Sequence, residues 1–133
     1  MANWYGNARS NYFKVKDEEA FKTWTESVCD LGYWEKDGLF AIYSEDQFGG
    51  WPSCRYVDER DEYEDIDLVE ELAEHLIDGD VAVLMEAGAL ALRYISGYAV
   101  AVNNTGKRVS VNLDDIYELA CKELGNNPTD AAY

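Results

Sequence analysis

The sequence is poor in the residues on which most enzyme and metal chemistry depends. It contains one histidine, His75, two prolines, and three cysteines, Cys29, Cys54 and Cys121, with no CxxC pair. An odd number of widely spaced cysteines predicts neither a disulfide framework nor a zinc cluster. No apolar run approaches the roughly 20 residues that cross a bilayer, and the N-terminus lacks the layout of a signal peptide. We therefore expect a cytoplasmic protein with free thiols.

Basic residues are also scarce, because 27 acidic residues face only 11 lysines and arginines and give a net charge of −16. A charge of this sign argues against direct binding to nucleic acid or to anionic lipid. It is unevenly distributed, since Asp58 to Asp80 holds twelve acids and one base, a net −11. This patch indicates a basic partner, although solubility alone is the simpler explanation.

The periodicity of the first half predicts strands and helices in alternation. A strand is expected over 11–16, and Asp17 is expected to cap a helix that Gly32 ends. Asp37-Gly38 lies between two aromatic and β-branched runs, which predicts a hairpin over Tyr33 to Ser44. Residues 46–66 contain Gly49-Gly50, aromatics and many acids, and are expected to form an irregular acidic loop.

The second half predicts a capped helix followed by a group of strands. Asp67 and Glu70 form a capping box for a helix that extends to Ile77, and Val81–Met85 is expected to be a central strand. Residues 91–102 and 107–111 are expected to form further strands, with a bulge at Gly97 and a turn at 103–106. Asn112 is expected to cap a last helix that Gly125 closes.

Together these elements predict a single α+β domain over residues 1–133. Their order is β-α-β-β-α-β-β-β-α, with an antiparallel sheet of five to six strands and three helices. The first six elements have the order of a ferredoxin-like split β-α-β unit. We expect the helices to lie on one face of the sheet.

Catalytic and metal sites are weakly supported by the sequence. His75 lies one turn after Glu71 in the second helix, where a structural contact accounts for it. Cys54 is the cysteine expected to be exposed, and Arg55 beside it is expected to lower its pKa. The run "DERDEYEDID" lacks the spacing and central glycine of a calcium loop. We therefore expect no enzyme, no metal and no cofactor.

The acidic stretch is the main candidate for a functional site. The N-terminus of a helix stabilises acids such as Asp67, Glu70 and Glu71, but not those that precede the helix or follow it. Carboxylates along a helix or a strand are separated by distances of the order of those between DNA phosphates. The candidate partner-binding residues are therefore the acids together with two aromatic anchors: Trp51, Asp58, Glu59, Asp61, Glu62, Tyr63, Glu64, Asp65, Glu70, Glu71, Glu74 and Asp78.

Two features resemble known proteins. The run "DERDEYEDID" beside an acidic helix resembles the nucleic-acid-mimicking inhibitors of phages and plasmids, the anti-CRISPR and antirestriction proteins. The opening "MANWYGNARSNYF" is similar to the M-x-N-W-x-x-N start of some phage and plasmid proteins with a ferredoxin-like domain. The first resemblance implies a non-enzymatic inhibitor, in the cytoplasm of a bacterial host, that occupies the nucleic-acid-binding surface of a defence complex.

Three functions stay open on the sequence alone. The first is this inhibitor, acting as a monomer or homodimer on a CRISPR effector complex rather than on a restriction enzyme. The second is an antitoxin or immunity protein that covers a basic toxin, which would use the same electrostatics. The third is a small enzyme or ligand-binding domain that uses Cys54 or His75.

Overall fold

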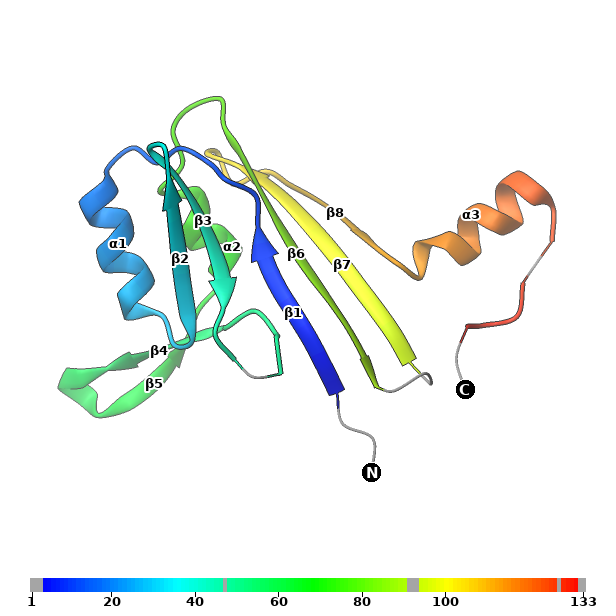
Figure 1. Ribbon diagram of the computed structural model, residues 1–133, viewed down its shortest axis with the longest axis horizontal. Coiled ribbons are helices and arrows are strands. Elements are labelled where there is room, and N and C mark those ends of the chain that lie inside the picture. Colours follow the sequence, from blue (N-terminus) through cyan, green and yellow to red (C-terminus); the bar gives the residue numbers. More distant parts are fainter. Residues whose placement is uncertain (1–3, 47, 91–93, 127, 132–133) are drawn as a thin grey trace.

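The computed structural model describes residues 4–46, 48–90, 94–126 and 128–131, which form a six-stranded antiparallel sheet, a separate two-stranded hairpin and three α-helices (Figure 1). The strands of the main sheet lie in the order β2-β3-β1-β6-β7-β8. Their bounds are β1 Trp4–Ser10, β2 Leu31–Lys36, β3 Leu39–Ser44, β6 Val81–Leu90, β7 Tyr94–Asn103 and β8 Arg108–Asn112. The predicted α+β class and the numbers of sheet strands and helices are confirmed.

The connections explain this strand order. Helix α1 (Glu18–Ser27) links β1 to β2, and helix α2 (Leu68–Ala73) precedes β6, so that β1 lies between β3 and β6. The order β2-β3-β1-β6, with a helix in each crossover, is that of the ferredoxin-like split β-α-β arrangement. Strands β7 and β8 then extend the sheet beyond β6, and helix α3 (Asp115–Leu124) follows β8.

Local signals in the sequence account for the helix starts and for one turn. The Asp17 carboxylate accepts a hydrogen bond from the Ala20 N–H at 3.1 Å, and the Asp67 carboxylate accepts one from the Glu70 N–H at 3.1 Å. Asp37 and Gly38 adopt φ angles of 53° and 80°, which a tight two-residue hairpin requires. Gly125 ends α3 with a φ of 76°. These expected features are confirmed.

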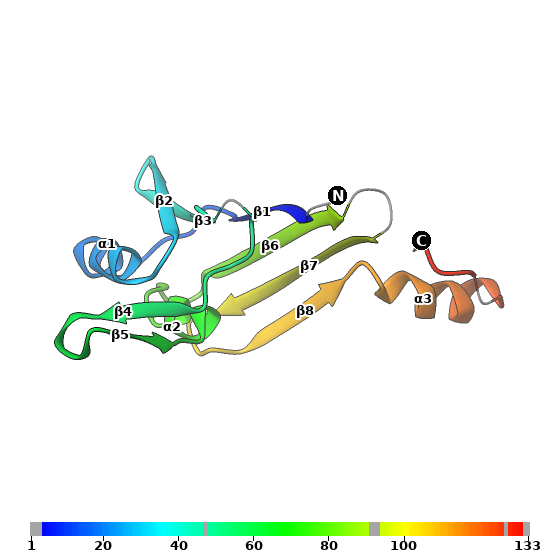
Figure 2. The same ribbon diagram turned by 90° about the horizontal axis from the view of Figure 1, so that it is seen from below.

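The hydrophobic core lies between the sheet and helices α1 and α2, which cover the same face (Figures 1 and 2). Phe21 and Trp24 of α1 and Leu72 of α2 pack against the strands. The fully buried side chains on the sheet side of this layer include Phe40, Ile42, Leu84 and Val102. Helix α3 has no buried residue and continues past the end of β8 (Figure 1).

The predicted start of the sheet is wrong. The first strand is β1, Trp4–Ser10, not residues 11–16, because Trp4 to Ser10 pairs along its length with β6. Residues 11–16 form only isolated bridges, from Phe13 to Phe40 and from Val15 to Leu76. The alternation that predicted a strand there reflects the burial of Phe13 and the half-burial of Val15.

Helix lengths and two other details also differ from expectation. Helix α1 ends at Ser27, and Gly32 lies in β2, since Leu31 and its neighbours pair with β3. Helix α2 ends at Ala73 rather than Ile77. Strand β6 extends to Leu90, and its pairing with β7 is continuous through Gly97, so no bulge forms there. Asn112 ends β8 instead of capping α3.

Within the described residues, every helix is too short or too polar to cross a membrane.

Candidate partner-binding surface

A two-stranded hairpin occupies the stretch that was expected to be an irregular loop. Strand β4 (Cys54–Val57) pairs with β5 (Glu62–Asp65), and a 3₁₀ turn over Asp58–Arg60 connects them. Asp61 takes a left-handed conformation, with a φ of 48°, where a glycine is usual. The prediction of a loop over 46–66 is therefore wrong for its acidic half, which has a defined register.

The hairpin is anchored to both helices of the core. Val28, just after α1, forms an antiparallel bridge to Arg55, and the Cys29 N–H donates to the Cys54 carbonyl at 3.0 Å. The Arg55 guanidinium binds the Glu71 carboxylate of α2, and that carboxylate also accepts the indole N–H of Trp24 at 2.9 Å. The acids of the hairpin and of α2 are thus held in a fixed relation.

Arginine side chains neutralise four of the twelve acids in this region. Arg55 binds Glu64 as well as Glu71, and Arg60 binds Glu62 at 3.3 Å and Glu64 at 2.9 Å. Arg108 of β8 binds Asp67 at 2.6 Å, and this hydrogen bond holds the pKa of the Asp67 carboxyl below its usual value. Glu62, Glu64 and Glu71, expected to face a partner, therefore already have partners within the chain.

Six other carboxylates accept no hydrogen bond and form no ion pair with any described residue. All six side chains are exposed, and we call them the acidic surface: Asp58, Glu59, Asp65, Glu70, Glu74 and Asp78. Asp61 differs because it accepts the Tyr56 hydroxyl, and this hydrogen bond raises the pKa of Tyr56. In Figure 2 the hairpin and α2 lie next to each other along one edge of the molecule.

The two faces of the hairpin have different chemistry, because successive residues of a strand point to opposite sides. Arg55, Glu62 and Glu64 share the face that holds the ion pairs. Tyr56 and Tyr63 lie opposite each other on the other face, with ring centroids 5.3 Å apart. Tyr63 is 68% exposed, as expected of an aromatic anchor.

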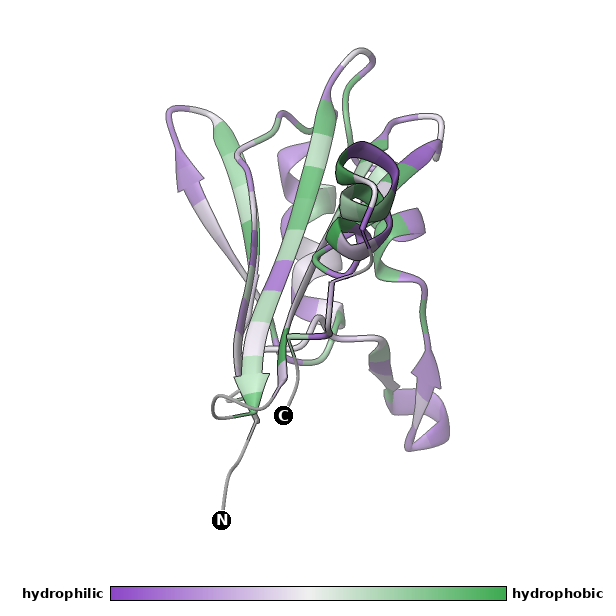
Figure 3. Cartoon of the chain, turned by 90° about the vertical axis from the view of Figure 1, so that its right-hand side faces the viewer, coloured by the Kyte–Doolittle hydropathy of each residue, from purple (hydrophilic) through white to green (hydrophobic). Residues whose placement is uncertain are grey.

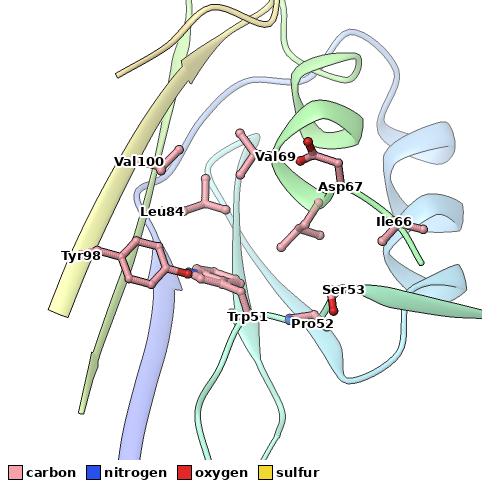
Figure 4. Close-up of a pocket in the computed structure, with 10 residues that line it drawn as sticks. Trp51, Pro52, Ser53, Ile66, Asp67, Val69, Leu84, Tyr98 and Val100 are labelled. Atoms are coloured by element: carbon pink, nitrogen blue, oxygen red, sulfur yellow. The ribbon is translucent and has the colours of Figure 1, made fainter. Parts of the chain in front are cut away.

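Trp51 does not fit the expected role of an exposed anchor. Its ring is half-buried against the hydrophobic core, and its backbone N–H donates to the Glu86 carboxylate at 2.8 Å. It lines a cavity of about 430 Å³ that lies between α2 and strands β6 and β7 (Figure 4). Its indole N–H is buried and has no hydrogen-bond partner among the described residues. Trp51 therefore supports the fold beneath the acidic surface.

The two residues considered for catalysis have structural neighbours. Cys54 is half-buried and Cys121 is the exposed cysteine, so the expected exposure of Cys54 is wrong. The thiol of Cys54 lies beside that of Cys29, whose hydrogen bond raises the pKa of Cys54. The expectation that Arg55 lowers this pKa is wrong, because the Arg55 guanidinium binds carboxylates instead. The His75 ring packs on Trp24 at a centroid distance of 5.1 Å, and burial lowers the pKa of His75.

The two arginines that organise the hairpin, Arg55 and Arg60, were not predicted from the sequence. A signal was present, since Tyr56 and Tyr63 are placed symmetrically about the turn at 58–61, and Arg55 and Glu64 are the next pair outward. Among the residues that the structure describes, no three His, Cys, Asp or Glu side chains gather as a metal site. Comparisons with family models, with curated proteins and with solved structures find no match for this chain.

Proposed function

We propose that this protein is an acidic inhibitor that blocks the nucleic-acid-binding surface of a bacterial defence complex by imitating a phosphate backbone. A CRISPR effector complex is favoured over a restriction enzyme as the target, in line with the resemblance of the acidic run. The observation that carries the proposal is the acidic surface: six exposed carboxylates, without a partner among the described residues, on the hairpin, on α2 and in the segment that follows α2.

The repulsion between these carboxylates supports a binding role for them. Uncompensated like charges destabilise a compact state, and the chain places its arginines on other acids nearby. The six free carboxylates can form ion pairs with Lys and Arg of a partner, and their long-range field would speed the encounter.

The anchoring of the hairpin supports specific binding rather than a loose counter-ion effect. Contacts from Arg55 to Glu71 and from Cys29 to Cys54 hold the acids in place before a partner arrives. Preorganisation of this kind lowers the entropy cost of binding. Tyr63 adds an exposed aromatic ring beside the acids, and aromatic residues are frequent hot spots of protein interfaces.

The test is a pull-down from bacterial lysate with the wild-type protein, followed by a DNA-competition assay on the captured complex. Binding should compete with DNA and weaken as salt rises, since the interface depends on charge. Asp58→Asn, Glu59→Gln and Glu70→Gln together should weaken binding by at least about tenfold, which corresponds to about 1.4 kcal/mol.

A matched triple variant controls for net charge. Glu18→Gln, Glu19→Gln and Glu35→Gln remove the same charge from exposed positions at the start of α1 and on β2, which are not part of the acidic surface. This control should bind like the wild type. If both triple variants bind equally well, or if the affinity does not change with ionic strength, the acidic surface is not the binding site.

A further inference from the structure

A second surface of the molecule is apolar and lies on the face of the sheet that α1 and α2 leave uncovered. Strand register places twelve residues of β6, β7 and β8 on this helix-free face: Asn103 at its end, and Val81, Val83, Met85, Ala87, Ala89, Ile95, Gly97, Ala99, Ala101, Val109 and Val111. Eleven of the twelve carry no charged or polar side chain, in a chain whose net charge is −16. Met85, Ile95, Val109 and Val111 are each more than half exposed.

Helix α3 adds a second unburied apolar element next to this face. The Leu113 side chain lies over Gly97, and its N–H donates to the Gly97 carbonyl at 2.9 Å, so the helix starts from the helix-free side. Beyond this point Ile116, Leu119 and Leu124 are 58%, 50% and 77% exposed. In Figure 3, β6 and one side of α3 are coloured hydrophobic, whereas the hairpin is mostly hydrophilic.

The size of this apolar surface exceeds what a monomer usually exposes. Eight large apolar side chains contribute, each at least half exposed: Met85, Ile95, Val109, Val111, Leu113, Ile116, Leu119 and Leu124. Their combined exposed area is on the order of the roughly 800 Å² that each partner buries in a standard interface. Monomeric proteins rarely expose a contiguous apolar patch of more than roughly 300–600 Å².

We propose that the helix-free face of β6–β8 and helix α3 form the interface between two copies of this chain. The surface is self-complementary: it combines a projecting amphipathic helix with a flat sheet face rich in alanine and glycine. A two-fold axis would place α3 of each copy on the sheet face of the other, and such an interface is closed. It would also shelter β8, which is one of the two edge strands of the described sheet and has every residue exposed.

The acidic hairpins of two copies would stay apart in such a dimer, although α3 itself carries Asp115, Glu118 and Glu123 against one base, Lys122. The hairpin, which carries half of the acidic surface, lies at the opposite end of the molecule from α3 (Figure 1). Two copies joined through the apolar surface would therefore keep their hairpins apart and free. The interface does not depend on the proposed inhibitor function, because it uses other residues.

The test is the mass of the purified full-length protein in solution, measured by light scattering after gel filtration from about 1 to about 100 μM. We expect about twice the 15.1 kDa of the chain. The dimer should persist in about 1 M NaCl, because apolar interfaces are not screened. A monomer over this whole range, including one whose apolar surface instead binds another protein, overturns the proposal.

Two variants locate the interface. Val111→Glu and Ile116→Glu should each halve the measured mass, with an unchanged circular dichroism spectrum, because both side chains are already more than half exposed. Tyr63→Glu is the matched control, since Tyr63 is 68% exposed but lies on the hairpin, and it should stay dimeric. A dimer that survives both apolar substitutions, or a mass that grows beyond a dimer with concentration, contradicts the closed two-fold interface.

Discussion

Arg55 on β4 binds the carboxylate of Glu71 on α2, and this contact ties the acidic hairpin to the core. Both side chains are mostly buried, with 23% and 24% of their surface exposed. The same carboxylate accepts the Trp24 indole N–H, so that three elements, α1, β4 and α2, meet at one acid. Such a contact stabilises the fold and positions the acidic surface at once.

Loss of the ion pair between Arg55 and Glu71 should lower the stability of the fold. Arg55→Met removes the charged partner of a mostly buried carboxylate, so we expect a loss of about 1–3 kcal/mol in the free energy of unfolding. Arg60→Met is the control, because the Arg60 side chain is 54% exposed and its ion pairs should contribute under about 1 kcal/mol. Urea unfolding followed by circular dichroism measures both. Equal losses in the two variants would show that Arg55 has no special role.

Gly49 should tolerate alanine less well than other glycines of positive φ. Its φ is 80°, and a Cβ atom there would overlap the backbone carbonyl of Gly6 in β1. Gly79 has a φ of 86°, but no atom lies near its Cβ position. We expect Gly79→Ala to cost about 1–2 kcal/mol from backbone strain, and Gly49→Ala to cost clearly more. Thermal unfolding compares the two, and similar losses would contradict the close approach to β1.

His75 should make stability depend on pH below neutrality. Burial against Trp24 and Phe21 lowers its pKa in the folded state, and the nearby Lys16 adds to this effect, while Glu71, Glu74 and Asp17 oppose it. The unfolded state then binds the proton more readily. This contribution to stability is full above the ordinary pKa of about 6.5 and declines as pH falls through the lower, folded-state value.

The measurement is urea unfolding at pH 7.5 and at pH 5.5, for the wild type and for His75→Gln. The wild type should lose more stability than the variant between these values, because only it carries the titrating imidazole. The comparison between the two proteins removes the contribution of the many carboxylates, which they share. An identical pH dependence in both proteins would show that the environment of His75 does not resist protonation.

Cys29 and Cys54 should form a disulfide under mild oxidation. They lie opposite each other beside the Val28–Arg55 bridge, and directly paired antiparallel residues have Cα atoms about 5.5 Å apart, within the range that a disulfide spans. Treatment with a diazene oxidant such as diamide should remove two hydrogens from this pair and leave the Cys121 thiol free. Peptide mapping by mass spectrometry identifies the link, and a bond from Cys121 to either residue would contradict the geometry.

Local chemistry explains which parts of the fold were predictable. Asp17, Asp67 and Asp37-Gly38 act on residues within four positions of themselves, so the sequence around them was enough. The position of β1 was missed because its main partner, β6, lies some eighty residues later in the chain, whereas its pairing with β3 is short. Helix α2 was predicted too long, because Leu76 continues the apolar pattern but belongs to a bridge with Val15.

In the candidate site, too, features set by nearby residues were predictable and features set by distant residues were not. The acids were visible in composition, but whether each one is free depends on arginines brought close by the fold, such as Arg108 of β8 against Asp67. The hairpin was missed because its strands are polar on both faces and turn on Asp61 rather than on glycine. Trp51 was predicted to be exposed because the segment around it shows no hydrophobic periodicity, yet its side chain packs on the core.

The pairing of β1 with β6 also sets the order in which the protein can be completed during synthesis. Trp4 is paired with Leu90, so β1 has no main partner until β6 has been made. The β2–β3 hairpin and α1, in contrast, involve neighbouring residues and can form early. Non-local pairing of this kind slows folding. Strand β1 therefore has to wait for β6, the fourth strand of the main sheet in chain order, before its long ladder can form.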